Sequence, residues 1–221
     1  KYVADRYCAV VDVNMVDDAS GQVILNSTFN SASPPTAFKT ANGAVNALRI
    51  AIGNADIAGS IIYFKNGSHA LYGGAMTSGT YASYWLELKN FPDESPAITS
   101  ISTGALPVDS YIKMNGLDVR ISTGNFASGE TAIWIDSCTD NRTGGYFVYS
   151  SITPTIYYLT NNTVNVAQNI PYGTTNNPIA ILRNNHFNAS GRLNAYMIIG
   201  NKDGGISTYY SGMTIPPIDN L

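Results

Sequence analysis

The chain has 221 residues, of which 44% are hydrophobic and only 12% are charged, and its formal net charge is -3. This charge excludes the electrostatic attraction that drives binding to nucleic acids or anionic membranes, and no apolar run approaches the roughly 20 residues needed for membrane insertion. A content of 20 glycines and 15 tyrosines with few charges is typical of a β-rich protein with many turns, and we expect it to be secreted or displayed on a cell or virion surface.

The N-terminal part, residues 1–35, contains two strand-like runs, CAVVDVNMV and QVILNSTF. Both are rich in β-branched residues, so we expect strands that join the first repeats of a larger sheet. The chain begins at Lys1 rather than at Met, and we expect a processed chain or a segment of a longer one. Cys8 and Cys138, the two cysteines, form either one bridge or two buried thiols.

The next segment, PPTAFKTANGAVNALRIAIG, predicts the one helix of the chain. Thr36 is the expected N-cap and Gly53 the expected end. The apolar residues at helical spacing are Phe38, Ala41, Val45, Leu48 and Ile52. We expect this helix to cover one end of the β-structure, where strand edges would otherwise stay unpaired.

The rest of the chain repeats a short strand-like phrase. Aligned on the last apolar residue before a turn, the copies end at Phe64, Leu88, Met114, Ile135, Leu159 and Leu182. Successive copies are 24, 26, 21, 24 and 23 residues apart. A period of this size indicates a stacked solenoid.

Within each copy the apolar residues alternate as in a strand, for example Ile112 with Met114 and Ile133 with Ile135. We therefore predict an all-β fold, a right-handed parallel β-helix (β-solenoid) with an N-terminal capping helix, whose equivalent strands stack about 4.8 Å apart. The expected organisation is a single domain. Residues 1–35 supply strands that join the first coils, and residues 36–221 form the capping helix and the β-helix.

Asparagine marks the turn after most of these strands. The position two residues after the aligned apolar residue is occupied by Asn66, Asn90, Gly116, Ser137, Asn161 and Asn184. Asn tolerates the left-handed conformation, and its amide can hydrogen-bond to the Asn of the next coil. We predict a structural ladder of Asn66, Asn90, Asn161 and Asn184.

The phrases FKTANGAVNAL…IIYFKNGSHAL, LTNNTV and LRNNHF resemble those of the pectate-lyase-like superfamily of right-handed parallel β-helix proteins, over about residues 36–203. The resemblance implies the fold and a range of functions: polysaccharide lyases, glycoside hydrolases, phage tailspikes, surface adhesins and structural modules. Lyases of this group use Ca²⁺-binding carboxylates clustered on one strand face, with a catalytic Arg or Lys. The sequence contains no such acidic cluster.

The outer face of the predicted coils is rich in aromatic residues. The residues one and three positions before the aligned ones point outward, and they include Tyr63, Trp85, Tyr111, Trp134 and Tyr158, with Glu87 and Lys113. One interpretation is a glycan groove, in which rings pack against sugars and the charged pair hydrogen-bonds to hydroxyls. The other, which we favour, is a face covered by the segment GSHALYGGAMTSGTYAS or by a neighbouring subunit, because large exposed apolar faces are usually buried.

Whether the chain is an enzyme stays open, and an enzyme of this kind would be a polysaccharide lyase or hydrolase. The best catalytic candidates are Glu87, Lys113, Asp136 and Arg183, although hydrolysis needs two carboxylates about 5–10 Å apart. No cofactor or metal site is expected, and Ca²⁺ has no support because the turn NKDGG lacks the spacing of known Ca²⁺ loops.

Three functions therefore remain. The first is an extracellular or virion-surface module with a structural or adhesive role, which contacts glycans through the aromatic face. The second is a polysaccharide-degrading enzyme. The third is a purely structural solenoid that self-associates into a fibre or trimer.

Overall fold

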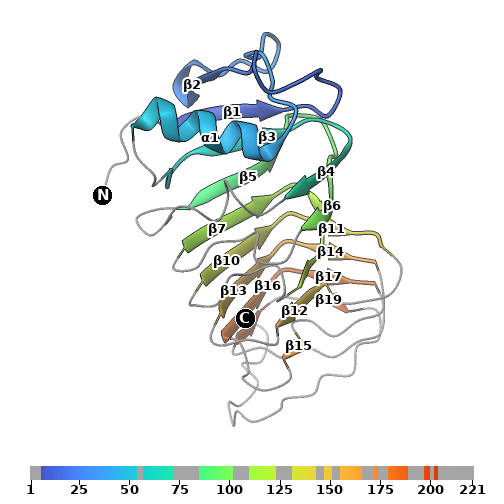
Figure 1. Ribbon diagram of the computed structural model, residues 1–221. Helices are drawn as coiled ribbons and strands as arrows, with labels where there is room; N and C mark the ends of the chain where they lie inside the picture. Colours follow the sequence, from blue (N-terminus) through green and yellow to red (C-terminus); the bar gives the residue numbers. More distant parts are fainter. Residues whose placement is uncertain are drawn as a thin grey trace.

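The computed structural model of the protein describes residues 6–53, 57–71, 85–101, 110–122, 131–142, 147–150, 155–165, 172–173, 179–188, 197–199 and 202–203. These residues are mostly strands in parallel sheets, with one α-helix, α1 (Ala41–Ile52), and a 3-10 turn, η1 (Asn26–Thr28). Figure 1 shows α1 beside the first strands, and the later strands stacked in order along the molecule. Within the described ranges, no helix is long and apolar enough to cross a membrane.

The strands form three sheets. The first has nine strands in the order β18-β16-β13-β10-β7-β5-β3-β1-β2, the second has seven in the order β19-β17-β14-β11-β8-β6-β4, and the third has three in the order β15-β12-β9. The described pairs are parallel except β1 with β2, which is antiparallel.

The strands of the first sheet are β1 (Tyr7–Val11), β2 (Val23–Leu25), β3 (Ile61–Phe64), β5 (Leu86–Asn90), β7 (Ser110–Asn115), β10 (Thr131–Asp136), β13 (Thr155–Thr160), β16 (Ile179–Arg183) and β18 (Met197–Ile199). Those of the second are β4 (Ser68–Leu71), β6 (Ala97–Ile101), β8 (Asp118–Val119), β11 (Thr139–Asp140), β14 (Thr163–Val164), β17 (His186–Phe187) and β19 (Lys202–Asp203). Those of the third are β9 (Ile121–Ser122), β12 (Val148–Ser150) and β15 (Tyr172–Gly173).

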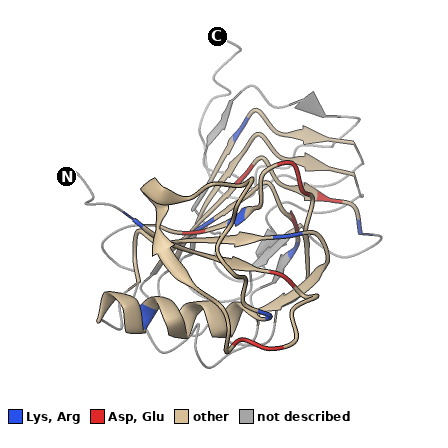
Figure 2. Ribbon diagram, turned by 90° about the horizontal axis from the view of Figure 1, so that it is seen from above, with Lys and Arg blue, Asp and Glu red and all other residues tan. Residues whose placement is uncertain are grey.

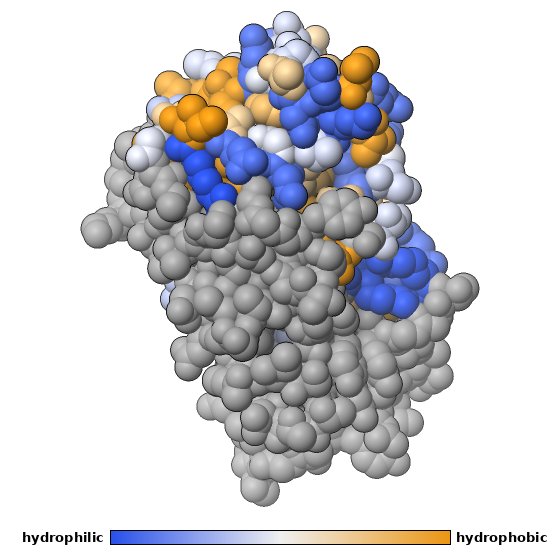
Figure 3. Space-filling view, viewed as in Figure 1, coloured by the Kyte–Doolittle hydropathy of each residue, from blue (hydrophilic) through white to orange (hydrophobic). Residues whose placement is uncertain are grey.

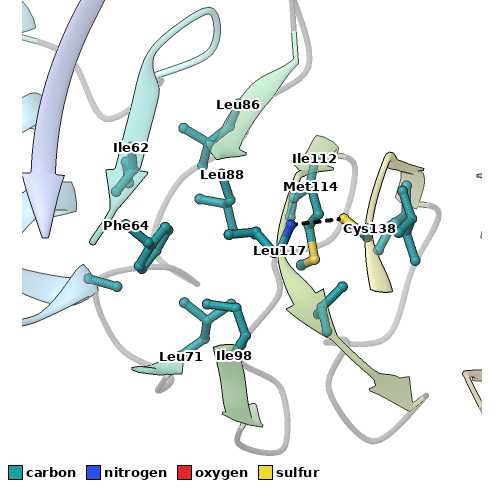
Figure 4. Packing of buried hydrophobic residues seen from close by; sticks show 14 of the residues in the cluster. Ile62, Phe64, Leu71, Leu86, Leu88, Ile98, Ile112, Met114, Leu117 and Cys138 are labelled. Atoms are coloured by element: carbon teal, nitrogen blue, oxygen red, sulfur yellow. Dashed lines mark hydrogen bonds between the residues drawn. The ribbon is translucent and has the colours of Figure 1, made fainter. Parts of the chain in front are cut away.

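From the second repeat onwards, the strands of the first sheet pair in the register that the sequence predicts. Leu88 pairs with Met114, Met114 with Ile135, Ile135 with Leu159, and Leu159 with Leu182. All five side chains are fully buried. Figure 4 shows part of the core that they build with residues of the second sheet such as Leu71 and Ile98. A fully buried side chain of this size contributes about 1.5–3 kcal/mol, so the repeats stack because each repeat buries its own apolar pair.

The predicted register of the first repeat is wrong by two residues. Leu88 pairs with Ile62 rather than with Phe64, and Phe64 pairs with Asn90. A shift of two residues keeps every side chain on its own face of the sheet, so alternation cannot distinguish the two registers. The turn after β5 spans residues 91–96, whereas the turn after β3 spans residues 65–67, and this difference in turn length hides the true register.

The helix was predicted correctly at its end but not at its start. Gly53 adopts the left-handed conformation with φ 69°, and its N–H donates to the carbonyls of Arg49 and Ile50. The N-cap is Thr40, whose side chain accepts a hydrogen bond from Gly43 N, and not Thr36. Thr36 lies before the helix, and its carbonyl accepts a hydrogen bond from Gln22 N at 2.9 Å.

Single hydrophobic side chains lie exposed on the N-terminal part, and they do not merge into a continuous surface. In Figure 3, hydrophobic spots on the described part of this face alternate with hydrophilic residues. Val16 and Ile50 are the most exposed of the large hydrophobic residues described, at 87% and 82%. Isolated hydrophobic residues of this kind are normal on protein surfaces.

The asparagine ladder of the core uses the second Asn of each doubled pair. Asn162 and Asn185 are only 1% exposed. Asn162 Oδ1 accepts from Cys138 N at 2.9 Å, and Asn162 Nδ2 donates to Ile135 O and to Asn185 Oδ1, both at 2.9 Å. Asn185 Nδ2 donates to Leu159 O at 2.8 Å. These bonds give the buried side-chain amides their partners and supply an acceptor to the buried Cys138 N.

The first Asn of each pair is the turn residue. Asn161 and Asn184 adopt left-handed conformations with φ 57° and 54°, and Asn184 Nδ2 donates to Asn161 Oδ1 at 3.5 Å. The structure places Asn66 and Asn90 elsewhere. Asn66 Oδ1 accepts from Ser95 N, and Asn90 Nδ2 donates to the carbonyl of Glu94. The first two repeats lie outside this ladder because the turn after β5 is longer.

Both cysteines are buried and neither forms a disulfide, so the disulfide alternative is wrong. Burial raises the pKa of the Cys138 thiol to about 12. Cys138 occupies the position equivalent to Asn162 and Asn185, and Leu117 N donates to its sulfur at 3.5 Å (Figure 4). A weak sulfur acceptor therefore stands where the following coils carry an amide.

Replacing Cys138 by Asn is expected to extend the ladder and raise the free energy of unfolding by about 1 kcal/mol. The new amide can accept from Leu117 N and donate to Met114 O, as Asn162 does with Cys138 N and Ile135 O one coil further. Urea unfolding followed by circular dichroism measures the change. Cys138→Ala, which supplies no acceptor, is the matched control and should be less stable than the native chain. A Cys138→Asn variant no more stable than Cys138→Ala would contradict the ladder geometry.

Candidate functional site

Four aromatic rings gather on the outer face of the first sheet. The Trp85 ring lies 5.4 Å from Tyr111, 5.8 Å from Trp134 and 6.1 Å from Tyr158 between centroids, each at a steep interplanar angle. Edge-to-face contacts of this kind are favourable. Tyr111 is 42% exposed, so the cluster opens to solvent on at least one side. We refer to Trp85, Tyr111, Trp134 and Tyr158 as the aromatic cluster.

Strand alternation and register bring the rings together. Tyr111 lies in β7, one residue before the inward-facing Ile112, and Trp134 and Tyr158 are register partners on β10 and β13. Ala132 pairs with Tyr111, and its small side chain leaves room above the sheet for Trp85 to reach the later coils. The cluster therefore depends on the stacking of four repeats, and no single local motif encodes it.

Lys113 lies beside the cluster, between two carboxylates. Its Nζ is 3.5 Å from Glu87 Oε1 on one neighbouring strand and 3.7 Å from Asp136 Oδ2 on the other. The same Nζ lies 4.3 Å from the centroid of the Trp134 ring, a cation–π distance. Arg6 adds a longer contact, with Nη1 3.8 Å from Glu87 Oε2. Figure 2 shows positive and negative residues close to one another in the described part, as these pairs require.

Further hydrogen bonds fix the two carboxylates. Asn115 Nδ2 donates to Glu87 Oε1 at 3.2 Å. Asp136 Oδ1 accepts from Thr160 Oγ1 at 2.6 Å and from Asn161 Nδ2 at 2.9 Å. Trp134 Nε1 in turn donates to Thr160 Oγ1 at 2.7 Å, which joins the aromatic cluster to the polar side chains. The face is therefore preorganised, with rings toward the start of the strands and hydrogen-bonding groups toward their ends.

A shallow depression of about 310 Å³ lies where these groups meet. It is lined by Trp134, Asp136, Thr160, Asn161, Arg183 and Asn184. Arg183 pairs in register with Thr160 and is exposed. The structure thus brings the four catalytic candidates Glu87, Lys113, Asp136 and Arg183 onto one face, with the first three in direct contact.

Tyr63 does not belong to the aromatic cluster. In the true register it pairs with Lys89 and not with Glu87. The Phe29 ring stacks on it at 4.3 Å with an interplanar angle of 7°, and only 6% of Tyr63 is exposed. Burial also raises the pKa of its phenol. The N-terminal segment has therefore covered this ring, and Tyr63 cannot contact a glycan or a partner in this conformation.

Lys113 separates the two candidate carboxylates. Glu87 and Asp136 lie on strands two apart in the sheet, which places the backbones about 10 Å apart. Lys113 occupies the space between them and is paired with both. Among the residues with described positions, no three His, Cys, Asp or Glu side chains come together in a way that could hold a metal ion. Rings beside fixed donors and acceptors form a surface that suits a neutral or polar ligand with one apolar face.

The sequence interpretation missed a second charged cluster, around Asp140. Asp140 has no exposed surface and lies in β11, in register with Val119 and Val164 of the inward apolar column. Arg120 Nε and Nη2 donate to its two oxygens at 2.9 and 3.2 Å, and Arg142 Nε donates at 3.3 Å. From Met114 onwards, the position five residues after each aligned apolar residue reads Val119, Asp140, Val164 and Phe187. Asp140 is the single acid in this otherwise apolar column, and this is the signal from which the buried charged cluster could have been predicted.

One alternative for the aromatic face lies partly outside the described residues. The segment proposed to cover it, GSHALYGGAMTSGTYAS, includes residues 72–83, which the structure does not describe. The same applies to most of the turn NKDGG, of which only Lys202 and Asp203 are described.

Comparison with known proteins gives no match: no family model, no curated protein and no solved structure matches this chain. The resemblance to the pectate-lyase-like superfamily therefore stays a prediction from the quoted phrases, and the function has to be argued from the geometry of the aromatic cluster and its polar neighbours.

Proposed function

We propose that this chain is a right-handed parallel β-helix module that acts outside the cell or on a virion surface and binds carbohydrate through the aromatic cluster. The observation that carries the proposal is the position of four rings beside the Lys113 ion pairs on one face of a parallel sheet. Parallel pairing at intervals of 21–26 residues, in sheets with the same strand succession, supports the β-helix.

Sugar recognition explains why rings and fixed polar groups occur together. The C–H faces of a pyranose pack on aromatic rings, while its hydroxyls need directional partners. Thr160 and Asn161 already orient Asp136, so its remaining lone pairs can accept from a ligand hydroxyl without further ordering. An interface made only for packing would not need this polar edge.

Tryptophan emission tests the proposal directly, because both tryptophans of the chain belong to the aromatic cluster. Titration with a panel of neutral and acidic oligosaccharides is expected to change the emission saturably for at least one sugar. Tyr158→Ala keeps both reporters and removes one ring, so it should weaken that Kd about tenfold, the effect of losing roughly 1.4 kcal/mol of ring contact. Ile50→Ala, an exposed change on α1, is the matched control and should bind as the native chain does.

An unresponsive emission across the whole panel would refute the carbohydrate proposal, and so would binding that Tyr158→Ala leaves intact. The same mixtures separate the other two functions. Release of reducing ends or of unsaturated uronates would favour a polysaccharide-degrading enzyme that uses Glu87, Lys113 and Asp136. A sedimentation velocity profile that shifts to larger species with protein concentration, and returns to the monomer in Tyr111→Ala, would favour self-association through these rings.

A further inference from the structure

Three Asn-Gly pairs occur in the chain: Asn42–Gly43, Asn66–Gly67 and Asn115–Gly116. This dipeptide is chemically labile, because glycine has no side chain to hinder attack of its own nitrogen on the side-chain carbonyl of the preceding Asn. The attack also requires that the glycine N–H is not held in another hydrogen bond and that the backbone can move. The structure separates the three pairs by the first of these conditions.

Two of the pairs are protected. Gly43 N donates to Thr40 Oγ1 at 3.0 Å, and Asn42 is fixed in the first turn of α1. Gly116 N donates to the carbonyl of Asp136 at 3.2 Å, and the Asn115 amide is held by Glu87. In both pairs the nucleophilic N–H already donates to another oxygen.

Asn66 is different. It lies exposed in the turn between β3 and β4, and in the part of the chain that the structure describes no hydrogen bond engages the Gly67 N–H. Asn66 Oδ1 accepts a hydrogen bond from Ser95 N at 2.7 Å. A donor on this oxygen polarises the side-chain carbonyl and stabilises the negative charge that develops on it during attack.

The fold also keeps glycine at the nucleophilic position. Gly67 has φ 137°, a conformation that other residues rarely adopt, and a Cβ there would lie 2.6 Å from Val13 Cγ2. The labile dipeptide is thus a by-product of the tight turn that starts the repeat.

We propose that Asn66 is a site of spontaneous, structure-directed deamidation. Gly67 N attacks Asn66 Cγ, ammonia leaves, and a succinimide ring closes between the two residues. Water then opens the ring at either carbonyl and yields aspartate or isoaspartate. The overall change consumes one water, releases one ammonia and needs no oxidant or reductant.

The product alters the junction between the first two repeats. The Glu94 carboxylate accepts the hydrogen bond of Asn66 N, so the new carboxylate forms beside an existing one. The change adds one negative charge to a chain of net charge -3. Aged samples are therefore expected to split into charge variants that differ at this turn.

Peptide mapping by mass spectrometry tests the proposal on the intact chain, incubated in mildly alkaline buffer and sampled over weeks. The peptide with Asn66 is expected to gain the mass of an amide-to-acid conversion about tenfold faster than those with Asn42 and Asn115, a barrier difference of ~1.4 kcal/mol. In concentrated urea the three rates should converge, because the hydrogen bonds that distinguish them are gone. Asn66→Gln, which would need a larger ring to react, identifies the charge variant by its disappearance.

Equal rates for the three peptides in the folded chain would overturn the proposal. The same ranking in urea as in the folded chain would also overturn it, because the ranking would then come from the local sequence and not from the structure.

Discussion

Replacement of Asp140 by Ala is expected to lower the free energy of unfolding by about 3 kcal/mol. Asp140 has no exposed surface and accepts three hydrogen bonds from the guanidinium groups of Arg120 and Arg142 and one from Arg142 N. Without the carboxylate, two guanidinium groups lose the partner that offsets their desolvation. We take the low end of the range for broken buried pairs because the two arginine side chains are 18% and 30% exposed and can reach water. Urea unfolding followed by circular dichroism measures the loss.

Two further variants make this prediction specific to the buried pair. Asp118 also faces Arg142, but at 4.0 Å and with 25% of its side chain exposed, so Asp118→Ala should cost under about 1 kcal/mol. Asp140→Val would complete the apolar column between Val119 and Val164 but would leave Arg120 without an acid and Arg142 with only the longer contact to Asp118. It should therefore also destabilise, and a valine variant as stable as the native chain would contradict the argument.

The repeat could be predicted because one backbone feature controls many residues. Each coil places its last two alternating apolar residues inward, and from Leu88 to Leu182 the sequence alignment gives the observed pairing. The same alignment puts Trp134 beside Tyr158 and Glu87 beside Lys113, so most of the candidate site follows from the period alone.

The features that the sequence did not predict correctly lie at the turns. The unequal turns after β3 and β5 shift the first register by two residues, and this shift moved Tyr63 into the wrong column. The doubled asparagines show a related effect. Positive φ at Asn161 and Asn184 lets the chain reverse direction there, and it is the following residues, Asn162 and Asn185, that turn inward and are buried.

The contacts that long side chains make across strands also could not be predicted from the sequence pattern. Lys113 contacts carboxylates on both neighbouring strands, although Asp136 pairs in register with Asn115 and not with Lys113. The two arginines of Asp140 come from residues at and beyond the ends of the short strands, where alternation no longer specifies direction. Such contacts depend on distances between coils, which a period does not give.

Replacement of Asn162 by Ala is expected to cost about 3 kcal/mol of unfolding free energy. The change removes the acceptor of Cys138 N and one donor to Ile135 O, and both residues are buried. Asn165→Ala is the matched control. Asn165 Nδ2 also donates to the equivalent Asn of the preceding coil, Asn141, at 2.6 Å, but on the exposed surface, so its loss should cost under about 1 kcal/mol.

A double-variant cycle tests whether Asn162 and Asn185 stabilise each other as a ladder or act independently, each on its own turn. Asn162 and Asn185 share two hydrogen bonds, from Asn162 N and Asn162 Nδ2 to Asn185 Oδ1, at 3.0 and 2.9 Å. The bond between the two amides is lost in either single variant and can be lost only once, so Asn162→Ala with Asn185→Ala should cost less than the two single losses combined, by about 1 kcal/mol. Strict additivity would mean that each amide stabilises only its own turn. The stacking of the repeats would then derive its specificity from the apolar columns alone. The Cys138→Asn variant would gain no stability from the neighbouring Asn162 amide.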